Sequence, residues 1–285
     1  MEYVNPQALV GTDWLAENLD VPNVRVIDVS YFLPGANRDP RQEFAAKHIP
    51  GAVFFDIDDI SDKSNDLPHM LPDAGTFSEK VSALGIGNDD KVIAYDASGG
   101  GMAAARGWWM FRVFGHKDVS VLNGGLPKWQ AEGRPTTGEA PSPAPATYTA
   151  AKNEALVRDI DQVLANVDSR TEQVVDARSK DRFDGTAPEP REGARAGHIP
   201  GSFNLPFVQF LDNDRNFVMR DADELTEAIS TAGLDLGRPV TASCGSGVTA
   251  AMLAFGFYLI GKEDVAVYDG SWSEWGMRSD TPIDT

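Results

Sequence analysis

The sequence predicts an α/β protein built from two tandem domains, each with a mostly parallel sheet covered by helices on both faces. Short runs rich in Val, Ile and Ala alternate with longer helical runs, a pattern typical of parallel sheets. The chain also repeats itself after about 150 residues, a period that indicates duplicated domains rather than a solenoid. Its 285 residues are enough for two cores of about 130–140 residues each.

The elements follow in order from these patterns. Strands are expected at 24–29, 91–95, 119–122 and 239–242, and helices at 77–84, 103–114 and 249–260. In sheets of this kind, reactive groups gather where a strand ends and a helix begins. The turns after these strands are therefore the places to look for chemistry.

Matching segments define the two copies. The strand at 26–29 recurs at 174–177, the HIPG turn at 48–51 recurs at 198–201, and the segment 119–125 recurs at 265–271. The stretch between the copies is rich in Pro, Ala, Ser and Thr and has little core-forming content. We therefore predict a first domain at 1–134, a linker at 135–153 and a second domain at 154–285.

Composition narrows the function classes. The net charge of −18 argues against nonspecific nucleic-acid binding, and an anionic substrate would need local arginines. No apolar run approaches the roughly 20 residues that span a bilayer, and no secretory signal is visible. A single cysteine excludes internal disulfides and an all-cysteine metal site. These features predict a cytoplasmic protein without membrane or nucleic-acid partners.

That cysteine, Cys244, occupies a glycine-rich turn between the strand at 239–242 and the helix at 249–260. Inward-facing amides and the positive end of the helix favour the thiolate there. The first copy has Asp96 at this position, in a loop two residues longer, and aspartate cannot act as a sulfur nucleophile. We therefore expect the second domain to be catalytic and the first to supply one wall of a cleft.

Three motifs add a family resemblance that covers about residues 4–278. They are CGSGVT at 244–249, RFDGTAPEPR at 182–191 and YDGSWSEW at 268–275. The chain resembles the tandem-domain sulfurtransferases of the rhodanese superfamily, and most closely their mercaptopyruvate branch. The resemblance implies two domains with mostly parallel five-stranded sheets. It also implies transfer of a sulfane sulfur from 3-mercaptopyruvate through a Cys244 persulfide to cyanide or a thiol, with release of pyruvate.

The resemblance assigns further residues to the site. Arg182 and Arg191 would hold the carboxylate and keto oxygens of the substrate, because guanidinium forks fit planar carboxylates. Ser246, His69 and Asp58 would form a proton relay, with Asp56 and Asp59 as open alternatives to Asp58. The loop groups expected to surround the sulfur are Gly245, Gly247, Val248 and Thr249. The family pattern implies no metal or cofactor, a monomer, and thioredoxin as one acceptor.

The other histidines and two nearby arginines are expected to be structural or peripheral. His48 and His198 belong to the HIPG turns and should hold loop geometry, whereas His116, between a helix and a strand, is expected to face solvent. Arg178 and Arg195 are expected to be structural. His69 has no counterpart in the other copy, which favours a specific role.

Three alternatives remain at this point. A thiosulfate:cyanide sulfurtransferase would use the same cysteine, but such enzymes typically carry cations just after it, where this chain has Gly245 and Ser246. A cysteine-loop phosphatase usually has an arginine six residues after the cysteine, where this chain has Ala250. A noncatalytic sulfur carrier would need neither Cys244 nor the arginine pair to be retained.

Overall fold

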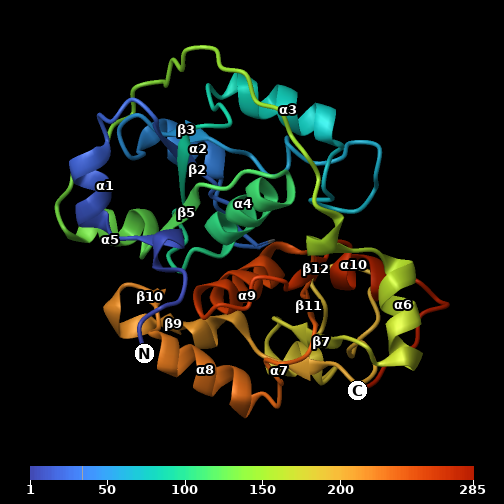
Figure 1. Cartoon of the computed structure of the whole chain (residues 1–285). Coiled ribbons are helices and arrows are strands. Elements are labelled where there is room, and N and C mark those ends of the chain that lie inside the picture. The colour runs from blue at the N-terminus through green and yellow to red at the C-terminus, as the bar shows by residue number, and fades with distance from the viewer. Residues whose placement is uncertain (34) are drawn as a thin grey trace.

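The computed structural model describes residues 1–33 and 35–285 and contains two α/β domains (Figure 1). The first domain contains η1 Pro6–Ala8, β1 Leu9–Val10, α1 Thr12–Asn18, β2 Val24–Asp28, α2 Pro40–Ala46, β3 Val53–Phe54, α3 Ala74–Ala83, β4 Lys91–Tyr95, α4 Met102–Val113, β5 Val119–Leu122 and α5 Gly125–Ala131. The second contains η2 Glu154–Leu156, β6 Val157–Arg158, α6 Ile160–Ser169, β7 Gln173–Asp176, α7 Lys180–Phe183, β8 Phe203–Asn204, η3 Phe207–Phe210, β9 Leu211–Asp212, η4 Asn213–Arg215, β10 Val218–Met219, α8 Ala222–Thr231, β11 Val240–Ser243, α9 Val248–Leu259, β12 Ala266–Tyr268 and α10 Ser271–Trp275. These elements confirm the predicted fold class.

The two main sheets have the same topology. Their strand orders are β1-β5-β4-β2-β3 and β6-β12-β11-β7-β8, and every pair of neighbours is parallel. The central strands β4 and β11 are almost entirely buried, as expected for a sheet covered on both faces. Their carboxyl ends lead directly into Asp96 and Cys244, so both loops begin at the same edge of their sheets.

Helices α4 and α9 form the main contact between the domains (Figure 1). Both are apolar on nearly all sides, which is why they can be buried between two sheets. Trp108 of α4 packs edge-on against Phe255 and Tyr258 of α9, with ring centroids 4.9 and 5.1 Å apart. Because the cysteine loop leads into α9, this packing places the loop at the seam between the domains.

The segment 135–153 follows the surface of the first domain without a helix or strand of its own. Thr137 forms an isolated antiparallel bridge with His48. Tyr148 is only 3% exposed and packs against Phe77, so the expectation of little core-forming content was wrong for this residue. The backbone N–H of Tyr148 donates to the hydroxyl of Ser82 at 2.9 Å, which ties the segment to α3.

The histidines outside the candidate site divide into one correction and two confirmations. His116 is 3% exposed rather than solvent-facing, its Nε2 lies 2.9 Å from the carbonyl oxygen of Asp90, and burial lowers its pKa. The reason is that Tyr148 folds back over it, with nearly parallel rings 5.7 Å apart. His48 and His198 hold loop geometry as expected, because each ring bonds a carbonyl oxygen of the preceding helix at 2.7 and 2.8 Å.

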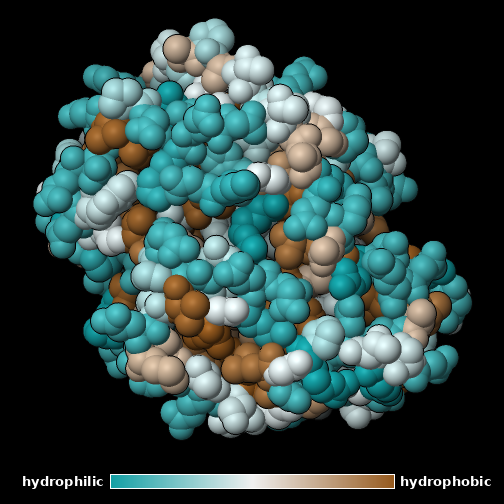
Figure 2. All heavy atoms as spheres, in the orientation of Figure 1, coloured by the Kyte–Doolittle hydropathy of each residue, from teal (hydrophilic) through white to brown (hydrophobic). Residues whose placement is uncertain are grey.

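The face seen in Figure 2 is mainly hydrophilic, with smaller groups of hydrophobic side chains along the seam and over the second domain. This distribution agrees with the net charge of −18. Among the helices of residues 1–33 and 35–285, none combines the length and the hydropathy needed to cross a bilayer.

Candidate active site

The cysteine loop is fixed from behind by the start of α10. Cys244 is 2% exposed, and its backbone N–H donates to the hydroxyl oxygen of Ser271 at 3.2 Å. The carbonyl oxygens of Cys244 and Gly245 accept hydrogen bonds from the N–H groups of Trp272 and Ser273 at 2.9 and 2.8 Å. These bonds occupy the carbonyl oxygens of Cys244 and Gly245 and do not involve the N–H groups of residues 245–249.

Those N–H groups distinguish the two copies of the loop. In the described part of the chain, none of the amides of residues 245–249 donates a hydrogen bond. In the first domain, by contrast, Asp96 accepts from the amides of Ala103 and Ala104 at 3.0 and 3.1 Å, and from the amide of Ser98 at 3.1 Å. The first loop is therefore neutralised by its own carboxylate, whereas the second offers its donors to an anion at Cys244.

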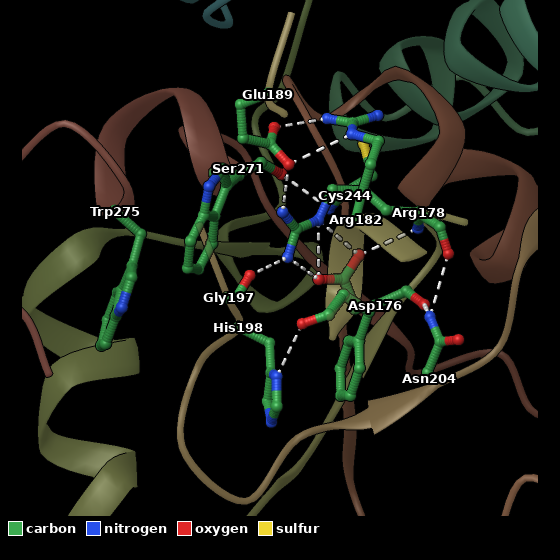
Figure 3. Close-up of polar contacts among 12 residues, drawn as sticks. Asp176, Arg178, Arg182, Glu189, Gly197, His198, Asn204, Cys244, Ser271 and Trp275 are labelled. Atoms are coloured by element: carbon green, nitrogen blue, oxygen red, sulfur yellow. Dashed lines mark hydrogen bonds and ion pairs between the residues drawn. The ribbon is translucent and has the colours of Figure 1, made fainter. Parts of the chain in front are cut away.

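A chain of alternating charges holds Arg182 against the cysteine loop (Figure 3). Arg178 donates to Asp176 at 2.7 Å and to Glu189 at 2.9 Å, and is 2% exposed. Glu189 in turn accepts from Nε and Nη2 of Arg182 at 3.1 and 2.6 Å. A Cβ atom on Gly245 would lie 3.4 Å from Nη2 of Arg182. Glu189 thus fixes one edge of the Arg182 guanidinium and balances its charge.

Arg191 differs because no carboxylate pairs with it in the part of the chain that the structure describes. It is half-buried and makes no side-chain hydrogen bond or ion pair within residues 1–33 and 35–285. Its charge is felt by Tyr31, whose pKa is raised to about 12 by burial and then by Asp58 and Cys244, while Arg191 lowers it. Arg191 and Cys244 are therefore both close enough to Tyr31 to affect the pKa of its phenol. The unneutralised cation there is the group best suited to attract an anionic substrate.

His69 comes from the first domain and meets Asp58. It is 5% exposed, and its Nδ1 lies 2.8 Å from Oδ1 of Asp58, although the atoms are not aligned for a hydrogen bond. The contact with His69 lowers the pKa of Asp58. Asp59 instead pairs with Lys80 at 2.8 Å, and Asp56 accepts from the backbone N–H groups of Asp58 and Asp59. Of the three carboxylates considered, Asp58 is the one in contact with the histidine.

The structure pairs two members of the expected relay, His69 and Asp58. Ser246 is half-buried in the loop, and no hydrogen bond joins it to His69 among the described residues. Val248 and Thr249 are buried at the start of α9, where their amides contribute to the donor set. Gly247 has a φ of 77° as the N-cap residue of this helix, a conformation that favours glycine.

Sequence reasoning missed two residues of the candidate site, Tyr31 and Glu189. Tyr31 packs edge-on against His69 with ring centroids 4.8 Å apart, yet no local pattern marks it. Glu189 could have been found, because it lies inside the motif that carries both arginines. Arg195 is structural as expected, since it donates to the backbone carbonyl of Thr281 at 3.0 Å. Among the described residues, no cluster of three His, Cys, Asp or Glu side chains could hold a metal ion.

Comparison with known proteins places this geometry in a family. The model of the rhodanese-like domain matches residues 11–132 and 159–278. The chain is 45% identical to human 3-mercaptopyruvate sulfurtransferase over 278 residues, which covers 96% of this chain and 93% of the human protein. It is also 45% identical to bovine thiosulfate sulfurtransferase over 279 residues, with the same coverage of both chains.

Solved structures agree with these relatives. The crystal structure of SseA from Escherichia coli, described as a 3-mercaptopyruvate sulfotransferase, superposes with a TM-score of 0.84. It is 39% identical in sequence, and the match covers 94% of this chain and 99% of that one. The two relatives differ in their named donors at equal identity, so overall similarity does not separate those donors. With both domains matched and the fold shared, the chain belongs to the rhodanese family.

Proposed function

We propose that this protein is a sulfurtransferase that moves a sulfane sulfur from 3-mercaptopyruvate through a Cys244 persulfide to cyanide or a thiol. One observation carries the proposal. Among the described residues, the amides of 245–249 in the second domain have no internal acceptor beside the only thiol, whereas the first domain fills the same cradle with Asp96. The relatives named for sulfur transfer and the unbalanced Arg191 support the same conclusion.

In the first half-reaction, the Cys244 thiolate attacks the sulfur of 3-mercaptopyruvate. The new S–S bond forms as the C–S bond breaks, and the electron pair of that bond passes to the carbon skeleton as the enolate of pyruvate. The loop amides stabilise the negative charge on sulfur. Arg182 and Arg191 hold the carboxylate and the keto oxygen, where charge develops. One proton on the enolate carbon then completes pyruvate.

We assign delivery of that proton to His69, with Asp58 as the carboxylate that orients it and Ser246 as the hydroxyl on the cysteine side. The contact of 2.8 Å between His69 and Asp58 supports the first pair. A hydrogen bond between Ser246 and His69 would have to form when substrate binds, because the two share none among the described residues. Tyr31, with its pKa raised to about 12, stays a neutral donor beside them.

In the second half-reaction, the acceptor attacks the outer sulfur and Cys244 leaves as the thiolate. Cyanide gives thiocyanate, and a thiol gives its own persulfide. Reduced thioredoxin as acceptor, a monomeric state and a cytoplasmic location stay predictions. On location, one relative, a thiosulfate/3-mercaptopyruvate sulfurtransferase of Arabidopsis thaliana that is 45% identical over 300 residues, is named as mitochondrial.

Donor preference is tested by adding a cation to the loop. Thiosulfate is a compact dianion, and the neutral Gly245 and Ser246 give it no countercharge. Ser246→Lys should raise the kcat/KM ratio of thiosulfate to mercaptopyruvate by about 10-fold, because a cation some 4 Å from a dianion is worth more than 1 kcal/mol even when well screened. Steady-state kinetics with both donors and cyanide as acceptor measure this ratio.

Ser246→Met is the matched control, since it also removes the hydroxyl but adds no charge. An equal donor ratio for the Lys and Met variants would show that loop charge does not select the donor. The same assay on the parent tests the proposed function. If its kcat/KM for mercaptopyruvate is well below that for thiosulfate, thiosulfate:cyanide sulfur transfer replaces our proposal.

The role of Asp58 is tested by Asp58→Asn. We expect kcat for mercaptopyruvate to fall by about 10- to 100-fold, part of the effect of general acid–base catalysis, because His69 loses its orienting anion. The pKa of Asp58 is lowered, so its charge is present above the ordinary value of 3.8 and is lost only as pH falls through the lowered one. Any acid limb of kcat above about pH 5 should therefore persist in the variant.

Asp59→Asn serves as the comparison, because Asp59 pairs with Lys80 at the surface instead. It should leave kcat close to that of the parent. A larger loss for Asp59→Asn than for Asp58→Asn would transfer the orienting role to Asp59.

A further inference from the structure

We propose that Arg106 is a positioning residue that fixes His69 of the first domain relative to the cysteine loop of the second. The proposal rests on the proposed function, because it concerns the proton transfer assigned to His69. Arg106 lies on α4 and is fully buried. It belongs to none of the motifs that carry the family resemblance.

One guanidinium joins three segments. Nη2 of Arg106 donates to Oδ1 of Asp269 at 2.8 Å and also to the backbone carbonyl oxygen of His69. Nη1 donates to the carbonyl oxygen of Gly247 at 3.3 Å. The other carboxylate oxygen of Asp269 accepts from the N–H of Leu71 at 2.7 Å. The ion pair thus binds the backbone of His69 and Leu71, and its arginine also contacts Gly247 in the loop that follows Cys244.

These hydrogen bonds are made where the backbone of His69 has an unusual conformation. Its φ of 61° lies in the left-handed region, which only a few per cent of residues other than glycine adopt, with histidine among the more frequent of them. Such a conformation persists only when its surroundings impose it. Here Arg106 holds the carbonyl of His69 and Asp269 holds the amide of Leu71, so both sides of the turn are fixed by one ion pair.

On the loop side, the fit is equally close. Gly247 has a φ of 77°, and a Cβ atom there would lie 3.0 Å from Nη1 of Arg106 and 2.9 Å from the carbonyl oxygen of Asp269. Asp269 is followed by Gly270 and Ser271, and the hydroxyl of Ser271 accepts from the amide of Cys244. The carboxylate that binds Arg106 therefore begins the same segment that supports the thiol.

The chemistry of the ion pair between Arg106 and Asp269 suits a role in positioning His69 better than a role in stabilising the fold. A buried ion pair gains little over a well-packed apolar pair, because both charges lose their water. What arginine adds is a planar fork that reaches several acceptors in fixed directions, which lysine cannot do. The guanidinium also lies 4.4 Å from the ring centroid of Trp109, which restricts its plane. Arg106 is suited to set the position of His69 relative to the thiol.

The same helix provides a control. Arg112 also reaches the second domain from α4, where its guanidinium lies 4.2 Å from the ring centroid of Tyr258 and 4.9 Å from that of Trp108. It contacts neither His69 nor the cysteine loop among the described residues. Arg112→Met therefore removes an arginine that contacts the other domain but leaves the contacts that position His69 in place.

The experiment is a double-mutant cycle between Arg106→Lys and His69→Asn, with pyruvate release from mercaptopyruvate as the readout. A misplacement of about 1 Å can cost 100-fold, so Arg106→Lys should lower kcat by about 10- to 100-fold. KM should change little, because the arginines assigned to the carboxylate lie elsewhere. In the His69→Asn background, the same substitution should cost less than about 3-fold, because its effect passes through His69.

An equal loss of kcat in both backgrounds, or an unchanged kcat for Arg106→Lys, would overturn the proposal. So would a matching loss for Arg112→Met, since that would indicate general weakening of the interface. Circular dichroism checks folding, and Asp269→Asn replaces Arg106→Lys in the same cycle if the lysine variant does not fold. A parent protein that releases no pyruvate is a separate result, which removes the proposed function and this inference with it.

Discussion

Cys244→Ser should lower sulfur transfer from mercaptopyruvate to cyanide by roughly 10⁴-fold or more, as expected when the sole nucleophile is lost. The hydroxyl of serine is a far weaker nucleophile near neutral pH and cannot carry a sulfane sulfur. The fold should survive, because serine is smaller than the buried thiol and the loop is held by backbone bonds to Trp272 and Ser273. Initial rates of pyruvate and thiocyanate formation measure the loss.

The parent should show double-displacement kinetics, with parallel lines when the acceptor concentration is varied at several donor concentrations. Ser98→Ala makes a comparable small change in the matching loop of the first domain and should leave turnover essentially unchanged. Sulfur transfer at the parental rate by Cys244→Ser would mean that the persulfide scheme is wrong.

Arg191→Ala should raise KM for mercaptopyruvate by about 10- to 100-fold, since a hydrogen bond to a charged group is worth roughly 1.5–3 kcal/mol. Arg191 has no internal partner in the described chain, so its whole charge is available to a carboxylate. Arg191→Lys should recover part of the loss, because it restores the charge without the fork. Steady-state kinetics with mercaptopyruvate measure each effect.

Through its lost charge, Arg182→Ala should weaken substrate binding less than Arg191→Ala does. It should disturb the geometry of the site more. Glu189 already balances Arg182, and removing the arginine leaves that carboxylate with Arg178 alone. The rate at which iodoacetamide alkylates Cys244 should change by a smaller factor than KM in all of these variants. Arg278→Ala is the control, because it removes an exposed arginine paired with Asp280. Equal mercaptopyruvate kinetics for Arg191→Ala and the parent would remove Arg191 from the site.

Most of the fold was predictable because its central elements are long and strongly patterned. The strand predicted at 91–95 is β4, and the helix predicted at 103–114 differs from α4 by one residue at each end. Edge strands such as β3 and β8 have two residues each, too few for a periodic pattern to reveal. Sheet neighbours, rather than local sequence, determine that these segments are extended.

The site was predictable where chemistry and local sequence coincide. Cys244 was identified from a glycine-rich turn between a strand and a helix, and the structure has that turn. Arg106 was missed because docking of the two domains brings it to Gly247 of the cysteine loop, and no spacing within one domain reports that contact. Tyr31 was missed because no local pattern marks its contact with His69. His116 was misjudged for a similar reason, since the fold-back of Tyr148 covers it.

The central claim is that the Cys244 sulfur carries the transferred sulfur atom as a covalent intermediate. Intact-protein mass spectrometry after brief incubation with mercaptopyruvate, without an acceptor, tests it most directly. We predict a gain of one sulfur atom per chain that disappears on addition of cyanide or a reductant and is absent from Cys244→Ser. An unchanged mass in a protein that still releases pyruvate, or the same gain in Cys244→Ser, would contradict the account.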